Sequence, residues 1–193
     1  MAFPVFLDTC VLYPLTLCDL LLRIAETGAY RVHWSPDVLE ELQRNLTLVA
    51  RHGERGAAGR IRAMEEAFPD ASVTGYEGLM GGLACHPKDR HVVAAAVHSG
   101  CQLIVTANLK DFPPTALARH DLQAVSPDSF LLDQLDLYPG QVMTALRQQS
   151  SDSGRPRLTP LGLLTSLERC GVPKFVTEIR RKSELSTWAP RTV

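Results

Sequence analysis

The stretch FPVFLDT, residues 3–9, contains an apolar run that ends at a carboxylate, Asp8. Consecutive large apolar residues at Val5–Leu7 predict a strand that is buried on both faces, as in a parallel sheet. A second apolar run, Gln102–Thr106, also leads into a polar loop. The chain therefore has two strands that belong in the middle of a sheet, and each is followed by polar side chains.

The segments around these two strands alternate between helical and extended patterns. We expect helices at 14–27, 36–50, 58–68, 87–100 and 127–134, strands at 31–34 and 122–125, a weak strand at 71–74, a polar joint at 53–59 and a flexible loop at 78–82. Such alternation predicts an α/β fold with a central parallel sheet. In this class of sheet, ligands bind beyond the carboxyl ends of the strands.

The length of 193 residues fits one domain with a small appendage. Ser150–Gly154 is typical of a linker, and two further helices are expected at 159–171 and 172–182. We therefore divide the chain into a first domain, residues 1–137, and a helical extension, residues 138–193. Residues 1–146 carry 11 Lys and Arg against 17 Asp and Glu, whereas residues 147–193 carry 9 against 4. The basic extension could attract phosphates or an acidic partner, or it could be an ordinary solvated surface.

The composition excludes several classes of protein. No uninterrupted apolar run is long enough for a membrane span, and the N-terminal residues lack the basic start of a signal peptide. The five cysteines are odd in number, scattered and without a C-x-x-C pair. This usage predicts reduced thiols in a cytoplasmic protein.

Four acidic residues occupy informative places in the predicted fold. Asp8 ends the first central strand, Asp111 follows the second, and Glu41 and Asp89 lie on the helices between them. If the two strands are neighbours, four carboxylates converge at one edge of the sheet, where like charges raise each other's pKa. A divalent cation with oxygen ligands resolves this conflict, and Mg²⁺ or Mn²⁺ suits such ligands.

Each acid also has a simpler explanation. Asp8 could cap the helix or turn that follows its strand, and Glu41 could be an ordinary glutamate at the boundary of the apolar stripe. Asp89 could be stabilised by a helix N-terminus, and Asp111 could be an ordinary loop residue. On the helix at 36–50, Glu40 points to solvent, whereas Glu41 lies at the margin of the apolar stripe. Glu41 is therefore the better candidate of these two. The joint placement of the four acids favours a site over four separate explanations.

Four motifs in order carry a resemblance to a known family: FLDTCVL at 6–12, SPDVLEEL at 35–42, HPKDRHVVAAAV at 86–97 and IVTANLKDFP at 104–113. Over residues 3–135 the chain resembles PIN-domain ribonucleases and is most similar to VapC-type toxins. The resemblance implies a three-layer α/β/α fold with a central parallel sheet. It also implies a Mg²⁺- or Mn²⁺-dependent endoribonuclease that hydrolyses RNA phosphodiester bonds, an RNA substrate, a cognate antitoxin as partner of a type II pair, and a homodimer.

The resemblance further assigns roles to residues of this chain. Catalytic and metal-binding roles fall on the four acids, Asp8, Glu41, Asp89 and Asp111. Supporting roles fall on the polar side chains Thr9, Thr106 and Asn108. Some family members carry an acid where this chain has Asn108, and here that role passes to Asp111.

Neighbouring cations and other groups complete the sequence predictions. Lys88, Arg90, Lys110 and Arg44 are candidates for contacts with RNA phosphates, and their alternative is solvated charge. Cys10 is expected to pack in the core. His86 and His91 flank Asp89 and are expected at the surface, and their alternative is contact with the substrate. Two other functions stay open: a PIN nuclease of RNA processing without toxicity, and a non-catalytic RNA- or protein-binding module of the same fold.

Overall fold

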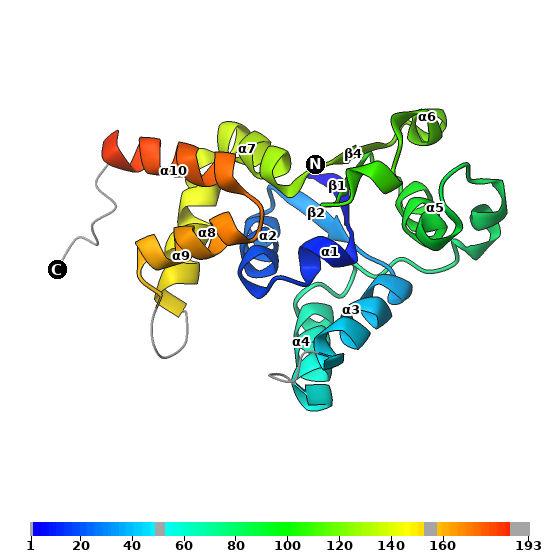
Figure 1. Ribbon diagram of the computed structural model, residues 1–193, viewed down its shortest axis with the longest axis horizontal. Coiled ribbons are helices and arrows are strands. Elements are labelled where there is room, and N and C mark those ends of the chain that lie inside the picture. Colours follow the sequence, from blue (N-terminus) through cyan, green and yellow to red (C-terminus); the bar gives the residue numbers. More distant parts are fainter. Residues whose placement is uncertain (1, 49–52, 153–157, 186–193) are drawn as a thin grey trace.

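Figure 1 shows the computed structural model of the protein, which describes residues 2–48, 53–152 and 158–185. Four parallel strands form the central sheet in the order β2-β1-β3-β4. Their bounds are Phe3–Leu7 for β1, Tyr30–His33 for β2, Leu103–Val105 for β3 and Gln123–Val125 for β4. The two strands expected in the middle are neighbours, with Val5 in register with Leu103. The predicted parallel sheet is confirmed.

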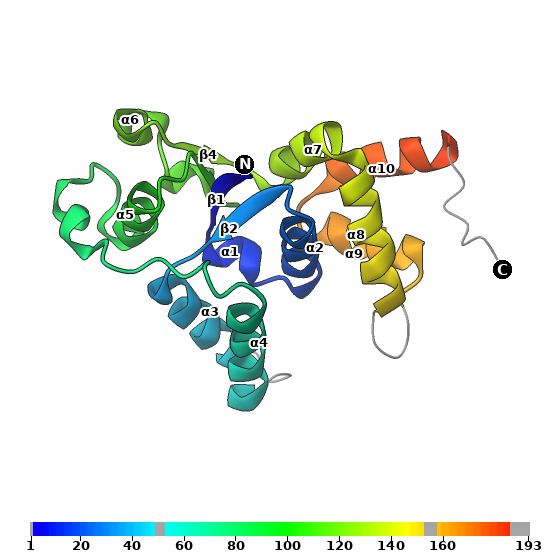
Figure 2. The same ribbon diagram turned by 180° about the vertical axis from the view of Figure 1, so that it is seen from behind.

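Helices cover both faces of this sheet. Helix α2 (Leu15–Glu26) lies on one side and α5 (Arg90–His98) on the other, in agreement with Figures 1 and 2. Figure 2 also shows α3 (Pro36–Leu48) and α4 (Gly53–Ala67) extending away below the sheet. The expected α/β/α layering is therefore confirmed. The described residues contain no helix with the length and apolarity that crossing a bilayer requires.

Several short elements connect these layers. One-turn helix α1 (Thr9–Leu12) follows β1 directly, and the sequence reasoning did not predict it. The others are η1 (Glu77–Gly82), η2 (Pro87–Asp89), η3 (Leu109–Asp111), α6 (Pro114–Leu117) and η4 (Ala118–His120). The flexible loop expected at 78–82 is thus wrong, because these residues form a 3₁₀ helix that packs against α5.

Two further predictions between β2 and α5 are also wrong. The polar joint at 53–59 belongs to α4, because the apolar stripe of that helix, at Ala57, Ile61 and Met64, begins inside the supposed joint. The strand expected at 71–74 is reduced to one isolated bridge between Trp34 and Ser72. Residues 49 and 50, the expected end of α3, lie outside the described residues.

Four helices make up the C-terminal part: α7 (Pro127–Leu137), α8 (Pro139–Asp152), α9 (Pro160–Arg169) and α10 (Pro173–Leu185). The helices expected at 127–134, 159–171 and 172–182 are confirmed. The linker expected at 150–154 is wrong for residues 150–152, which are the last turn of α8, and residues 153 and 154 lie outside the described residues. The boundary placed between residues 137 and 138 stays a prediction.

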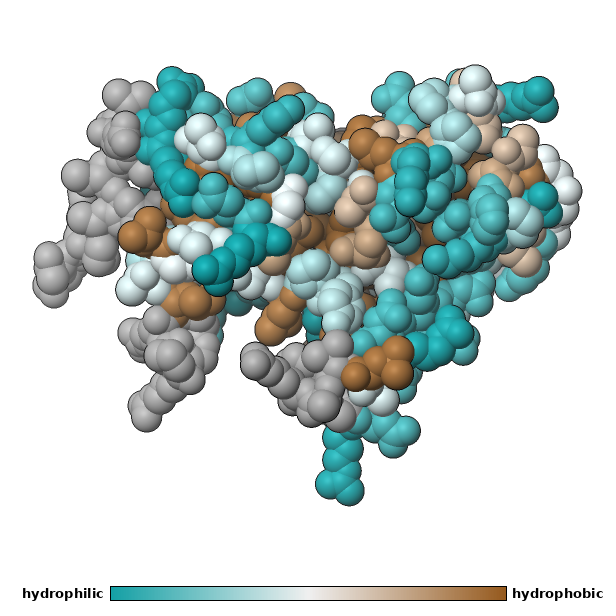
Figure 3. Space-filling view, viewed as in Figure 1, coloured by the Kyte–Doolittle hydropathy of each residue, from teal (hydrophilic) through white to brown (hydrophobic). Residues whose placement is uncertain are grey.

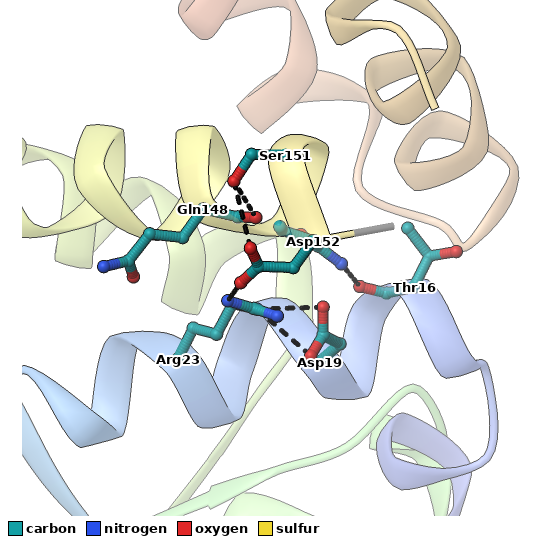
Figure 4. A network of polar contacts seen from close by, with 7 residues as sticks. Thr16, Asp19, Arg23, Gln148, Ser151 and Asp152 are labelled. Carbon is teal, nitrogen blue, oxygen red and sulfur yellow. Dashed lines mark hydrogen bonds and ion pairs between the residues drawn. The ribbon is translucent and has the colours of Figure 1, made fainter. Parts of the chain in front are cut away.

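Polar contacts fix two of these helices, α8 and α9, on α2, and Figure 4 shows the contacts between α8 and α2. The buried side chain of Gln149 donates through Nε2 to the carbonyl oxygen of Thr16 at 2.8 Å, and the hydroxyls of Thr16 and Ser166 are 2.9 Å apart. Arg23 of α2 pairs with Asp19 on its own helix and with Asp152 of α8. These contacts hold α8 helical through Asp152, because tertiary partners there outweigh the weak local helix preference of serine.

The basic character of the extension is partly engaged in ion pairs. Arg180 contacts Glu168, Arg181 contacts Glu178, and Lys182 lies near Asp136 and Glu178. These contacts favour the solvated-surface explanation of the extension's charge. On the face of the whole molecule that Figure 3 shows, apolar residues form separate small patches among hydrophilic ones.

A buried carboxylate joins α7 to α10 and gives a test of the packing. Asp128 is 8% exposed and accepts hydrogen bonds from the backbone N–H groups of Phe175 at 2.8 Å and Lys174 at 3.2 Å.

We expect Asp128→Ala to lower the free energy of unfolding by about 1–2 kcal/mol, because two N–H groups in the first turn of α10 lose their acceptor. Urea unfolding measures this, with the exposed Asp133→Ala on the same helix as control. Equal losses in both variants would contradict the capping role.

Candidate functional site

A pocket of about 510 Å³ opens at the carboxyl end of β1, between α3 and α5. Three of the four predicted acids, Asp8, Glu41 and Asp89, line it, together with Asn108. A cavity of similar volume, about 520 Å³, lies beside β2, but its lining has a single carboxylate, Asp70. The pocket at the end of β1 is therefore the candidate site, at the sheet edge where the sequence predicts it.

Asp8 is the most buried acid of the site, with 7% of its surface exposed. Its Oδ1 accepts the backbone N–H of Thr9 at 2.7 Å, so Asp8 also caps α1 as its simpler explanation foresaw. Its Oδ2 accepts the hydroxyl of Thr106 at 2.7 Å and the thiol of Cys10 at 3.0 Å. All of these donors are neutral, and within the described residues no cation forms an ion pair with Asp8.

Glu41 enters the site from α3. Its side chain is half-buried and its Oε2 accepts the hydroxyl of Thr9 at 2.9 Å. Glu40 is exposed and does not line the pocket. The predicted difference between the two glutamates is confirmed, and it follows from their positions relative to the apolar stripe of α3.

Asp89, at the N-terminus of α5, is the acid whose ionisation the fold alters most clearly. Burial raises its pKa, and the charges of Asp111 and Asp8 raise it further, while Lys88 and His86 act in the opposite direction. The effect of Asp111 is larger than that of Asp8, although Asp111 does not line the pocket. Three of the predicted acids thus share one neighbourhood, with Asp111 beside it.

The loop after β3 contributes two polar residues. Thr106 is fully buried, and its Oγ1 accepts the backbone N–H of Asn108 at 3.0 Å while its hydroxyl donates to Asp8. The side chain of Thr106 therefore links this loop to the carboxylate at the end of β1. Asn108 itself faces the pocket.

The sequence reasoning did not anticipate the contacts of Cys10 at this site, or those of Arg60, which lies outside the pocket lining. Cys10 was expected in the core, but it is half-buried, lines the pocket and binds Asp8. Burial, followed by the charge of Asp8, raises the pKa of its thiol to about 12, so the group is a neutral donor. Arg60 reaches from α4 to the carbonyl oxygens of Leu12 and Tyr13, at the end of α1. No local pattern in the sequence signals either contact.

His91 and the four candidate RNA-binding cations follow the sequence prediction only in part. His91 lines the pocket, which corrects the surface assignment, and its buried Nδ1 has no partner among the described residues. Of the four candidate RNA-binding cations, only Lys88 lines the pocket. Arg90 donates to the carbonyl oxygen of Cys85 at 3.4 Å, and the other two, Arg44 and Lys110, are exposed.

The donor set of the pocket fits a hard divalent cation in kind, because its acids offer carboxylate oxygens and no ion pair among the described residues engages Asp8. In the part of the chain that the structure describes, no three acidic, histidine or cysteine side chains form a ready-made cation site. Mg²⁺ usually keeps several waters and takes only one or two carboxylates from the protein. A pocket whose acids do not form a closed cluster agrees with this preference of Mg²⁺ for few protein ligands.

Two family models and a relative match this chain. Residues 4–110 match the family model described as PIN domain, and residues 127–181 match the model described as VapC50 C-terminal domain. The second match begins ahead of the boundary predicted at 137/138. A protein of Mycobacterium tuberculosis named "Putative ribonuclease VapC50" is 43% identical over 107 residues, which are 55% of this chain and 63% of that relative. The match thus spans less than two thirds of the relative.

A solved structure also resembles the chain. The structure of VapBC-1 from nontypeable Haemophilus influenzae contains a chain with 18% sequence identity and a TM-score of 0.47. The likeness covers 65% of this chain and 98% of the other.

The raised pKa of Asp89 predicts a pH-dependent stability. A carboxyl whose pKa is higher in the folded state binds its proton more tightly there, so its ionisation destabilises the fold above that pKa. We expect Asp89→Asn to stabilise the metal-free protein at pH 7 and to lose this advantage as the pH falls below the usual aspartate pKa. Urea unfolding in chelator, at pH 7 and at a pH below the usual aspartate pKa, measures this difference in the free energy of unfolding. Asp133→Asn is the control. A variant less stable than wild type at pH 7 would contradict the raised pKa of Asp89.

Proposed function

The chain belongs to the PIN-domain family, and from this premise we propose that it is a metal-dependent endoribonuclease that hydrolyses RNA phosphodiester bonds as the toxin of a type II toxin–antitoxin pair. The name of the M. tuberculosis relative supports a ribonuclease of the VapC kind, and the second family match extends the likeness to the C-terminal helices. The single observation that carries the proposal is the convergence of Asp8, Glu41 and Asp89 on one pocket.

Electrostatics explains why this pocket would need a cation. An RNA phosphate is negative, and a pocket lined by three carboxylates repels it. Lys88 is the only Lys or Arg in the described lining, so the protein's own charges do not reverse the repulsion there. Binding of Mg²⁺ or Mn²⁺ would turn the same carboxylates from an obstacle into the means of holding the substrate.

Each residue then has a role that follows from its contacts. Asp8, Glu41 and Asp89 would hold the ion, with Asp111 as a fourth acid beside them. When bound, such an ion activates water and neutralises charge on the phosphate. Thr106 orients Asp8, Thr9 orients Glu41, and Asn108 presents an amide to the pocket. Lys88 would contact the phosphate backbone, and Arg90, Lys110 and Arg44 have weaker support because they do not line the pocket.

The partners of this chain are part of the same proposal. The toxin role implies an antitoxin protein that neutralises the nuclease, and we also expect a homodimer in the cytoplasm. Co-expression with the product of an adjacent small gene would test the antitoxin. The expected result is a stable complex in which RNA cleavage is blocked. Normal growth of cells that express the nuclease without this partner would favour a role in RNA processing.

Metal removal is the first test of the mechanism. We expect the full chain to cleave single-stranded RNA in Mg²⁺ or Mn²⁺, and to lose cleavage in excess EDTA with recovery when the metal is returned. Asp8→Asn should lower the rate at least about a hundredfold, because it removes a charge that the cation requires. Gel analysis of labelled RNA measures both effects. Cleavage that persists in EDTA, or in Asp8→Asn, would overturn the metal mechanism.

The two adjacent glutamates offer a matched pair of variants. Glu41→Gln should lower cleavage about tenfold or more, whereas Glu40→Gln should stay within about twofold of wild type, because only Glu41 faces the pocket. Both changes remove one charge from the same helix, so unspecific effects cancel. Initial rates at saturating Mn²⁺ measure the difference, and equal losses would reject the role of Glu41.

A further inference from the structure

We propose that Cys10 is a positioning residue, whose thiol holds the carboxylate of Asp8 and the loop after β3 in one arrangement. This inference rests on the proposed function, since the carboxylate matters most if it holds a cation. It assigns to Cys10 a task that packing alone does not require.

The sulfur of Cys10 both donates and accepts a hydrogen bond. Its S–H donates to Oδ2 of Asp8 at 3.0 Å, and the sulfur accepts the backbone N–H of Ala107 at 3.1 Å. It also lies 3.3 Å from the hydroxyl oxygen of Thr106. Cys10 belongs to α1 and Ala107 to the loop after β3, so the thiol joins two segments that are far apart in the sequence.

The hydrogen-bond inventory shows why a second donor is useful there. Thr106 has one hydroxyl proton, which it gives to Oδ2 of Asp8, and its oxygen already accepts the N–H of Asn108. A side chain at position 10 that joins the carboxylate to the loop has to donate to Asp8 and accept from Ala107 at the same time. A thiol does both, a serine hydroxyl can also do both, and alanine can do neither.

A purely structural role explains these contacts less well. Helix α1 keeps its N-terminal cap without Cys10, because Oδ1 of Asp8 accepts the N–H of Thr9. The side chain of Cys10 is only half-buried, so its removal leaves a small cavity at most. Ala107 is exposed and would otherwise donate its N–H to water. The thiol thus orders a site that the rest of the fold would leave looser.

The first measurement needs no metal and no RNA. Amide hydrogen exchange, followed by NMR, reports the bond from Ala107 to the sulfur in the metal-free full chain. We expect the amide of Ala107 to exchange about fivefold faster in Cys10→Ala than in wild type, and to recover in Cys10→Ser. An unchanged exchange rate in Cys10→Ala would overturn the inference.

The second measurement is Mn²⁺ affinity by titration calorimetry, alongside RNA cleavage and thermal unfolding. Cys10→Ala should weaken Mn²⁺ binding and slow cleavage, each about tenfold, and Cys10→Ser should stay within about threefold of wild type. Cys101→Ala is the control, because the thiol of Cys101 also lies beside a hydroxyl, that of Ser99 at 3.2 Å, but Cys101 is buried and lies outside the pocket lining. It should change thermal stability while leaving Mn²⁺ affinity as in wild type.

The outcomes separate this inference from the proposed function. A wild-type chain that neither binds Mn²⁺ nor cleaves RNA contradicts the proposed function, and the exchange of Ala107 then still decides the role of Cys10. An active wild type with an equally active Cys10→Ala overturns the inference alone. Equal impairment of Cys10→Ser and Cys10→Ala also overturns it, because the effect would then follow from sulfur's size and not from its hydrogen bonds.

Discussion

The arrangement of this protein depends on one buried carboxylate that neutral groups hold in place. Asp8 stands at the end of the central strand β1, and its own N–H donates to the carbonyl oxygen of Val105 in the neighbouring strand. This register brings Thr106, the residue after β3, to the same edge of the sheet. Within the described residues no cation pairs with Asp8, and an ionised carboxylate that is buried without a counter-ion is costly in any fold. The cation proposed above would offset that cost.

The short helix α1 shows how local structure and site depend on each other. Four residues are too few for a helix to be stable alone, because nucleation costs more than one turn returns. Asp8 caps its first turn, and Arg60 of α4 binds the carbonyl oxygens at its last. The same turn presents Thr9 to Glu41. The site is therefore organised by contacts between distant segments, and it forms only when the tertiary structure does.

Much of this arrangement could be predicted from the sequence, for identifiable reasons. Buried parallel strands are continuous apolar runs, so β1 and β3 were visible, and acids that follow such runs must gather at one sheet edge. Helical periodicity distinguished Glu41 from Glu40 because a 100° rotation separates a margin from an exposed face. The metal-binding roles of these acids rest on the family resemblance and on the pocket, and they stay proposals.

The rest could not be read from local patterns. Cys10 accepts the N–H of Ala107 from the loop after β3, and Arg60 reaches α1 from a helix whose start was mistaken for a joint. The last turn of α8 has serines that favour a linker, and its docking on α2 decides otherwise. In each case a partner far along the chain overrides a weak local preference.

The way the C-terminal helices sit on α2 has a consequence for how the protein can be dissected. Several of their apolar residues, among them Val142, Leu146 and Leu163, are fully buried, and Thr16 of α2 bonds to both α8 and α9. A fragment cut after residue 137 would expose the underside of this layer and would tend to aggregate. Deleting the extension would therefore remove a buried apolar contact surface together with the basic charges. The role of those charges is better tested by substituting them one residue at a time.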